Sequence, residues 1–412
     1  MSDSSGRLME TKVSDALFVM AMATEVISQC LGSSELPMIF GIGYVFSSIK
    51  MISITLALIK IFFFSSYSPG ILLFSIALLS ASACAYWYSG SDYVMLMSIF
   101  VIAAYDVDFD LICRTVAICS TVCIVLVISL SLLGVLPNVV QERSYSFGLI
   151  SERRSLGFQH VNFLGGYVLL SVMSVLYLKR GKVGLLGYGI FLLLVAFLYQ
   201  YVNTKTSAAL LAMMMVLLFL SQHRLSGNVF LLLCALLVSG SLVLSFVLPY
   251  LYRPDVPFMT LIDELSSRRL SLDAMFLKSY SVAPFGQKLI LVSSIEANQT
   301  GIAMAVLDNT YLHLLLRFGL VPFILYLGMY GALLTKSVRT GDRTLLIMCT
   351  SILVCGIAEK WGFMVGYNVV LLALFAHTAG ASAVFSCDLT NCLDLGSHNL
   401  VPKIKKTRQL AY

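Results

Sequence analysis

Two adjacent arginines precede a histidine and an asparagine in the stretch RRSLGFQHVNFLGG at residues 153–166. Guanidinium groups are always charged and pair with phosphate oxygens through two parallel hydrogen bonds, so Arg153 and Arg154 could hold a phosphate or diphosphate. Histidine accepts a proton near neutral pH, which makes His160 a candidate general base. A structural role at the start of a helix fits His160 equally well, and the neighbouring Asn162 is compatible with both.

A second polar group occupies LDNTYLHLLLRFG at residues 307–319. Asn309, His313 and Arg317 recur every four residues, so in a helix they share one face. A charged side chain at membrane depth costs at least about 2.5 kcal/mol, which favours an Arg317 that faces the protein interior or reaches toward the interface. The stripe could line a polar cavity or form a polar seam between helices.

Further charged residues occur in short polar interruptions. A second arginine pair, Arg268 and Arg269, lies in LSSRRLSL at residues 265–272. Lys205 stands in the tight turn NTKTS, and Glu359 stands in the short turn AEKWG. Together these residues predict an electropositive cavity that binds an anion, to which Glu359 adds a carboxylate.

The composition indicates what must position these residues. Hydrophobic residues make up 59% of the 412 residues and charged residues 12%, against about 25% charged in soluble proteins. Apolar runs of about 20 residues, long enough to cross a bilayer, recur along the chain. They are too continuous for barrel strands, and helices satisfy their own backbone hydrogen bonds in lipid. The sequence therefore predicts an all-α, polytopic membrane protein.

Apolar runs between polar breaks give about twelve spans, or eleven because the second is long and the fourth short. They are predicted at residues 14–31, 37–62, 70–88, 92–105, 111–136, 160–178, 184–201, 206–221, 228–249, 308–335, 344–358 and 362–382. This predicts a cytoplasmic N-terminus at residues 1–13 without a cleavable signal, one multi-span domain at 14–382, and a cytoplasmic tail at 383–412.

The basic residues of the short connections set the orientation, because such residues stay on the cytoplasmic side. With the N-terminus inside, the inner turns carry Lys179, Arg180, Lys182, Arg224, Lys336, Arg339 and Arg343. The same topology places two large loops outside, at residues 137–159 and 250–307. The arginine pairs then lie at the outer surface, where a lipid-linked diphosphate is an obvious anionic partner.

Several functional classes lack sequence support. Nucleic acid is an implausible partner at an outer membrane face, and the chain has no glycine-rich loop followed by Lys-Ser/Thr for ATP. Most of the ten cysteines lie in apolar segments and lack metal-site spacing. The acidic stretch DVDFD at residues 106–110 falls on the predicted inner side. We therefore expect no metal and no cofactor.

The stretch RRSLGFQHVNFLGG resembles the Arg-x-Leu-Gly-Phe-x-His-x-Asn signature of Wzy-type polysaccharide polymerases of capsule and exopolysaccharide loci, although Val161 stands where the family usually has proline. LSSRRLSL, PFGQKL, LDNTYLHLLLRFGLV and GIAEKWGFMVGYNVVLL follow in the order seen in that family. NTKTSAALLA also fits, although Lys205 replaces a commoner arginine. The resemblance covers roughly residues 140–380.

The resemblance implies an inverting, metal-independent glycosyltransferase with a membrane fold of the glycosyltransferase-C type, related to O-antigen ligases. Such enzymes join oligosaccharide repeat units carried on undecaprenyl diphosphate, at the outer face of the bacterial cytoplasmic membrane. The lipid diphosphate is the leaving group. A flippase and a chain-length regulator are the partner proteins that this function suggests.

The resemblance and the residue chemistry together suggest roles. Arg154 and Arg269 would bind the diphosphate, with Arg153 and Arg268 as supporting charge, and His160 would be the base. The other predicted substrate-binding residues are Asn162, Lys205, Asp308, Asn309, Tyr311, His313 and Glu359, the last as a partner for an arginine or a competing base.

Two other functions remain open. An O-antigen-ligase-like enzyme would transfer a finished glycan to another acceptor with similar residues. A polysaccharide transporter or flippase would also have about twelve spans, but it needs polar groups through the full membrane depth. Here the polar residues gather in the predicted outer loops, and the chain shows no two similar halves.

Overall fold

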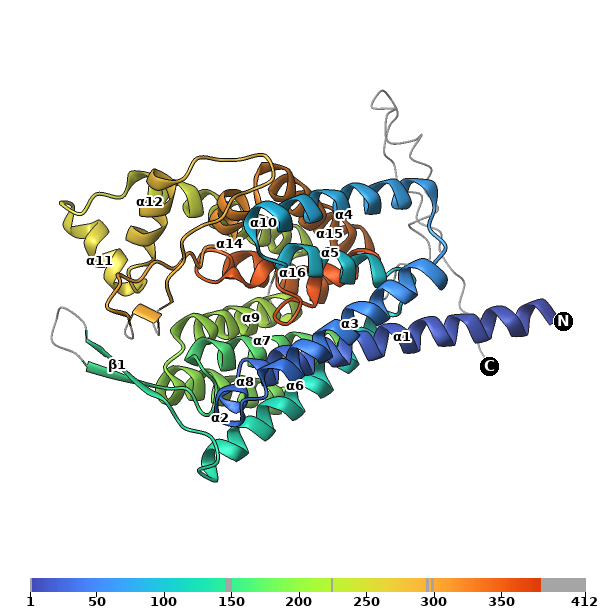
Figure 1. The fold of residues 1–412 in the computed structure, drawn as a ribbon, viewed down its shortest axis with the longest axis horizontal. Helices are drawn as coiled ribbons and strands as arrows, with labels where there is room; N and C mark the ends of the chain where they lie inside the picture. The colour runs from blue at the N-terminus through green and yellow to red at the C-terminus, as the bar shows by residue number, and fades with distance from the viewer. Residues whose placement is uncertain (1, 145–149, 224, 294–295, 298–299, 379–412) are drawn as a thin grey trace.

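The computed structural model describes residues 2–144, 150–223, 225–293, 296–297 and 300–378, and it is dominated by long helices that run side by side (Figure 1). In this part of the chain, nine helical segments are long and apolar enough to cross a membrane. They are α1 (Ser2–Gly32), α3 (Gly43–Phe63), α4 (Pro69–Ser89), α6 (Phe109–Leu132), α7 (Val161–Leu178), α8 (Leu185–Ala196) with η1 (Phe197–Val202), α9 (Lys205–His223), α10 (Gly227–Leu251) and α15 (Leu320–Thr340). These segments confirm the prediction of an all-α, polytopic membrane protein as a general class.

Two predicted spans are helices too short to cross the bilayer alone. Helix α5 (Tyr93–Ala103) has 11 residues and α16 (Arg343–Cys355) has 13, which at 1.5 Å per residue gives about 16 and 20 Å. Most of their side chains are buried inside the bundle. The predicted span at 37–62 is also divided, because the short α2 (Leu36–Phe40) ends at Gly41, whose φ of 64° is left-handed.

The predicted span at residues 362–382 is not a membrane helix in its described part. It forms two 3-10 turns, η3 (Lys360–Phe363) and η4 (Val370–Leu374). Its apolar run reflects burial within the protein, since Val370, Leu371 and Leu372 have no exposed surface. Residues 379–382 and the predicted tail at 383–412 lie outside the described residues.

Irregular backbone at membrane depth requires polar partners, because no water is present to satisfy it. The buried Lys336 of α15 supplies them by donating from Nζ to the carbonyls of Ala373 (2.7 Å), Leu374 (3.3 Å) and Ala376 (2.9 Å). Sequence analysis counts Lys336 as a basic residue of an inner turn, whereas the structure places it inside the bundle.

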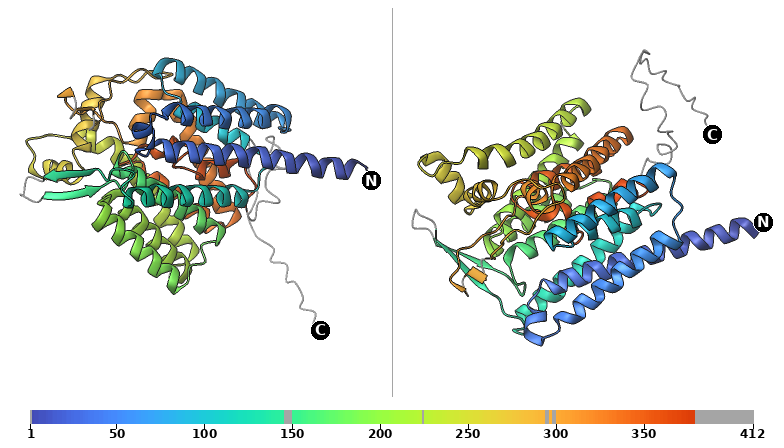
Figure 2. Two further views of the ribbon diagram at one scale, coloured as in Figure 1. Left: turned by 60° about the horizontal axis from the view of Figure 1, so that its bottom comes forward. Right: turned by 45° about the horizontal axis from the view of Figure 1, so that its top comes forward.

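The polar loops gather at one end of the bundle, opposite the N-terminus of α1 (Figure 1). Residues 137–159 contain an antiparallel hairpin of β1 (Val140–Ser144) and β2 (Ile150–Arg154). Residues 250–307 contain α11 (Pro257–Leu265) and α12 (Arg269–Ser279). Figure 2 shows the hairpin and these helices at this same end from two further directions. We call it the hairpin end.

Glycines allow the segments beneath the hairpin end to approach closely. A Cβ on Gly165 of α7 would lie 2.3 Å from the hydroxyl of Ser207 on α9, and one on Gly166 would lie 2.7 Å from the ring of Tyr367. The FLGG part of the first motif therefore lets α7 pack directly against α9 and against the segment that follows Glu359.

The long loop is fastened to the bundle by a second close approach. A Cβ on Gly286 would lie 2.1 Å from the carbonyl oxygen of Arg317, and one on Gly319 would lie 2.3 Å from the nitrogen of Gly286. Backbone hydrogen bonds from Gln287 to Arg317 and from Leu320 to Ala283 join the same two segments. This contact fixes the loop beside α14 (Thr310–His313) and η2 (Leu314–Phe318).

Candidate functional site

Five polar side chains from distant parts of the sequence meet at the hairpin end. They are Arg153 of β2, Asn162 of α7, Arg269 of α12, Asp308, and Glu359, which precedes η3. We call this group the arginine–carboxylate cluster. All five were candidates from sequence, and the structure brings them together through direct contacts.

Only one arginine of the first pair joins this cluster. Adjacent strand residues point to opposite faces, so Arg153 and Arg154 diverge. Arg153 donates to Asn162 Oδ1 at 2.8 Å and to the backbone oxygen of Asn203 at 3.2 Å. Arg154 instead pairs with Glu152 at 3.2 Å and lies over the ring of Tyr201, with its side chain 38% exposed. The geometry therefore favours Arg153 over Arg154 as a site residue.

The start of α7 positions the next two residues. His160 is the N-cap of this helix, and its Nδ1 accepts a hydrogen bond from the backbone N–H of Asn162 at 3.2 Å. Capping satisfies a backbone donor that would otherwise lack a partner. The Asn162 amide accepts from Arg153 and donates to Glu359 Oε1 at 3.0 Å. Asn162 thus links the hairpin to the carboxylates.

Glu359 lies at the centre of the cluster. Its Oε1 also accepts from Arg269 at 2.7 Å, and its side chain is 5% exposed. Arg269 lies 3.4 Å from Asp308 Oδ2 and donates to Thr206 Oγ1 at 3.2 Å. Burial raises the pKa of Glu359 above its usual value, and the ion pair with Arg269 opposes this change. Burial alone would lower the pKa of Arg269, but the two carboxylates outweigh it and keep the guanidinium charged.

His160 has an environment that disfavours its protonation. Burial, with the nearby positive charge of Arg153 and Arg269, lowers the pKa of His160 to about 4. Because Nδ1 accepts a hydrogen bond, the neutral ring carries its hydrogen on Nε2, which is then a donor. In this arrangement His160 is suited to donating a hydrogen bond to a ligand and is poorly suited to accepting a proton.

A second polar pair lies behind the cluster and includes a residue that sequence analysis missed. Asn309 caps α14 and donates to Asp273 Oδ2 at 3.1 Å and to the Ser245 carbonyl at 3.2 Å. Burial raises the pKa of Asp273 to about 8. Asp273 lies four residues after Arg269, on the same face of α12. That spacing is the signal that could have identified it.

Two predicted substrate-binding residues, Tyr311 and His313, are buried and make their contacts within the protein. The Tyr311 hydroxyl donates to the Leu353 carbonyl at 2.7 Å, and its side chain is 2% exposed. The His313 ring lies 5.7 Å from that of Phe318 and 5.3 Å from that of Phe363, and its Nδ1 is 2.7 Å from the Leu307 carbonyl. These contacts favour the polar seam between helices over a cavity lining.

Lys205 and Arg268 are both exposed, and they directly precede Thr206 and Arg269 in the sequence. Arg268 precedes α12 with a φ of 61°, and Ser267 has a φ of 72°, so the chain turns sharply before Arg269. Lys205 is the first residue of α9, next to Thr206, which contacts Arg269. Thr206 is a further contact that sequence analysis missed, although it belongs to the NTKTS turn.

The cluster can bind an anion through Arg153 and Arg269 and can accept protons or hydrogen bonds through Glu359 and Asp308. Among the described residues, no group of three or more His, Cys, Asp or Glu side chains is placed to hold a metal ion. A pocket of about 470 Å³ lies away from the cluster, at the opposite end of the bundle, around Arg180 and Arg343.

No protein-family model matches the chain, and a search of curated proteins finds no match.

Proposed function

We propose that this chain polymerises oligosaccharide repeat units carried on undecaprenyl diphosphate. The growing chain would move from its lipid carrier to the incoming unit, with inversion at the anomeric carbon and without a metal. The observation that carries the proposal is the convergence of Arg153 and Arg269 on one network through Asn162 and Glu359. These residues come from three of the motifs that resemble those of Wzy-type polymerases.

The leaving group explains why two arginines would be needed. Negative charge grows on the diphosphate as the glycosidic bond breaks, and preorganised cations stabilise that charge most effectively where water is scarce. Arg269 is 17% exposed and held from two sides by Glu359 and Asp308. Arg153 is held by Asn162 and Asn203. In this proposal the Nε2–H of His160 adds a neutral donor to the diphosphate.

We assign proton transfer to Glu359 in place of His160. Both side-chain hydrogen bonds to Glu359 from described residues reach Oε1, which leaves Oε2 to accept the proton of the attacking hydroxyl. Burial raises the pKa of Glu359, which strengthens it as a base. Asp308 would continue to balance the charge of Arg269 once Glu359 is protonated.

The same proposal sets the location. The hairpin end would face outward from a bacterial cytoplasmic membrane, with both termini in the cytoplasm, in a fold of the glycosyltransferase-C type. The turn that carries Lys179, Arg180 and Lys182 follows α7 and lies at the end opposite the hairpin, as the positive-inside rule requires. A flippase would supply the lipid-linked units, and a chain-length regulator would act with the polymerase.

The test is gel analysis of surface polysaccharide from cells that lack the gene, complemented with wild type or Arg269→Gln at equal membrane levels. A polymerase predicts loss of the repeat-unit ladder with single units remaining, and restoration by wild type alone. An unchanged ladder in the deletion strain would refute the proposal. Full-length chains that accumulate without transfer to their final acceptor would identify a ligase.

A further inference from the structure

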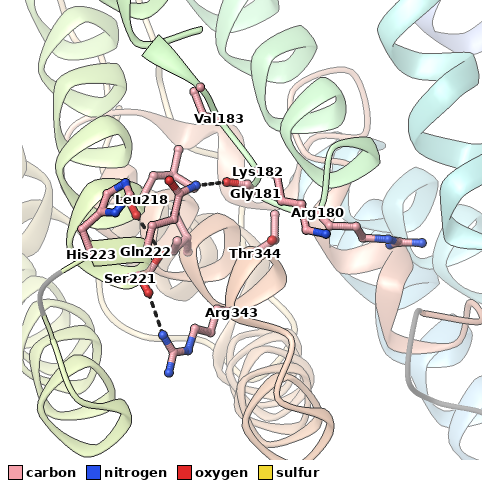
Figure 3. A pocket seen from close by; sticks show the side chains of 12 residues that line it. Arg180, Gly181, Lys182, Val183, Leu218, Ser221, Gln222, His223, Arg343 and Thr344 are labelled. Carbon is pink, nitrogen blue, oxygen red and sulfur yellow. Dashed lines mark hydrogen bonds between the residues drawn. The ribbon is translucent and has the colours of Figure 1, made fainter. Parts of the chain in front are cut away.

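The pocket opposite the hairpin end is formed by three elements. The turn between α7 and α8, the end of α9 and the start of α16 enclose about 470 Å³, and Figure 3 shows their side chains around it. The Gln222 amide donates to the carbonyl of Gly181, and Arg343 donates to the carbonyl of Ser221 at 2.6 Å. These bonds tie all three elements together, so the pocket is part of the packed structure.

The charge of the lining is entirely positive. Among the described residues that line the pocket, the ionisable side chains are Arg180, Lys182, His223 and Arg343, and none is acidic. Arg180 pairs with Asp110 at 2.5 Å and extends away from the pocket (Figure 3). Lys182, His223 and Arg343 are exposed. They are the groups available to a ligand.

Apolar surface adjoins this charge. Leu218 and Ile347 line the pocket and are buried. Leu185 and Leu186, at the start of α8, expose 91% and 81% of their surface. These leucines follow the lining residue Gly184 directly in sequence. A cationic pocket at the end of membrane helices, next along the chain to exposed leucines, matches a ligand with an anionic head and an apolar tail. A soluble anion would make no use of the leucines.

We propose that this pocket binds the phosphate of an anionic phospholipid. The phosphate would lie between Lys182 and Arg343, and the acyl chains would extend along Leu185 and Leu186 of α8. Because Arg343 is already oriented by Ser221, its remaining guanidinium hydrogens are preorganised for phosphate oxygens. Such a lipid would join the α7–α8 turn to α16, which leads to Glu359 at the other end of the bundle.

The test uses the purified full-length chain in neutral detergent. Native mass spectrometry would follow titration with phosphatidylglycerol and, in parallel, phosphatidylcholine with the same acyl chains. One phosphatidylglycerol should bind in preference to phosphatidylcholine. Each cation near a membrane surface strengthens binding of an anionic lipid about fivefold, so the double variant Lys182→Gln/Arg343→Gln should weaken it about 25-fold. Equal binding by the double variant would overturn the proposal.

Two further variants distinguish a specific lipid site from non-specific attraction by positive charge and from damage to the fold. Arg339→Gln removes an exposed cation from the C-terminal turn of the neighbouring α15, outside the pocket lining, and should leave binding unchanged. Lys182→Glu leaves the bond between Arg343 and Ser221 in place and should still weaken binding more than fivefold with an unchanged melting temperature. Equal effects of Arg339→Gln and Lys182→Glu on binding would refute a specific site.

An inorganic phosphate titration without added lipid distinguishes the two sources of a phosphate group. The lipid proposal predicts no saturable binding of phosphate below about 1 mM, since the leucines contribute only to a lipid. Tight binding of free phosphate that depends on Lys182, with no preference for phosphatidylglycerol, would show that the pocket takes a soluble anion and would refute the lipid assignment.

Discussion

Arg269 donates to Glu359 at 2.7 Å across a separation of 90 residues in sequence. The same carboxylate oxygen accepts from Asn162, which in turn holds Arg153. One buried carboxylate thus connects two arginine motifs that lie far apart in the sequence. Its position depends on the close packing of α7, α9 and the segment after Glu359, for which Gly165 and Gly166 leave room.

Arg269 and its neighbour Arg268 provide a matched pair of variants. Arg269→Gln removes the cation that faces Glu359 and Asp308 and leaves both carboxylates without it, so we expect a loss of about 3–5 kcal/mol in stability and no polysaccharide ladder. Arg268→Gln changes an exposed side chain and should keep the ladder and the melting temperature. Gel analysis and thermal unfolding of the purified variants measure both effects. Equal loss in the two variants would contradict the assignment.

Arg153 and Arg154 give a second matched pair because a strand directs them to opposite faces. Arg153→Gln should reduce polymerisation about 100-fold, the effect of removing one preorganised donor from a developing anion. Arg154→Gln loses a surface pair with Glu152 and should change activity less than threefold. Rates with purified lipid-linked repeat units would decide between them. A larger effect at Arg154 would restore the assignment made from sequence.

Sequence patterns predicted much of this arrangement because hydrophobicity and charge act locally. The long apolar runs identified the nine long helical segments found within the described ranges of the chain. The cluster residues Arg153, Asn162, Arg269, Asp308 and Glu359 were all candidates from sequence. Sequence did not separate Arg153 from Arg154, since that choice depends on a strand where only an outer loop was predicted.

The final apolar run shows a different limit. Residues inside a membrane protein are as apolar as those facing lipid, so hydropathy alone could not distinguish the buried 3-10 turns of residues 360–374 from a spanning helix. Asp273 was missed because its partner, Asn309, belongs to a distant segment. Sequence alone also could not show that Tyr311 and His313 are buried with partners inside the protein, because a polar residue in an apolar run can serve packing as well as binding.

The Lys336 ammonium group gives a direct test of how that irregular segment is stabilised. Lys336→Met leaves three buried carbonyls without this donor, and at about 1–3 kcal/mol for each unsatisfied group we expect a loss of at least about 3 kcal/mol. Arg339→Met, on the exposed side of the same helix, should change stability by less than about 0.5 kcal/mol. Thermal unfolding in detergent measures both. Unchanged unfolding of Lys336→Met would show that other groups satisfy these carbonyls.

His160 should make stability depend on pH. Its pKa is lowered to about 4 in the folded state, against about 6.5 when unfolded, so the unfolded state binds more protons between these values. Stability is therefore fully present above about pH 6.5 and falls as the pH drops, by about 2 kcal/mol at pH 5. His160→Asn keeps a capping side chain but cannot titrate. The difference in melting temperature between pH 7.5 and 5.0 should be smaller in this variant, and an equal difference would exclude His160 as the cause.

The contact between Gly286 and Gly319 should fix the long loop to the bundle. Alanine at Gly286 would place a Cβ 2.1 Å from the Arg317 carbonyl oxygen at a φ of 88°, so the two segments must separate. Strain and clash together should cost at least about 3 kcal/mol. Gly134→Ala has a similar φ of 75° but open space around the new Cβ, so it should cost only the backbone strain of about 1–2 kcal/mol. Limited proteolysis within residues 280–309 should accelerate in Gly286→Ala and remain slow in Gly134→Ala. Equal proteolysis of the two variants would show that the loop is held without this contact.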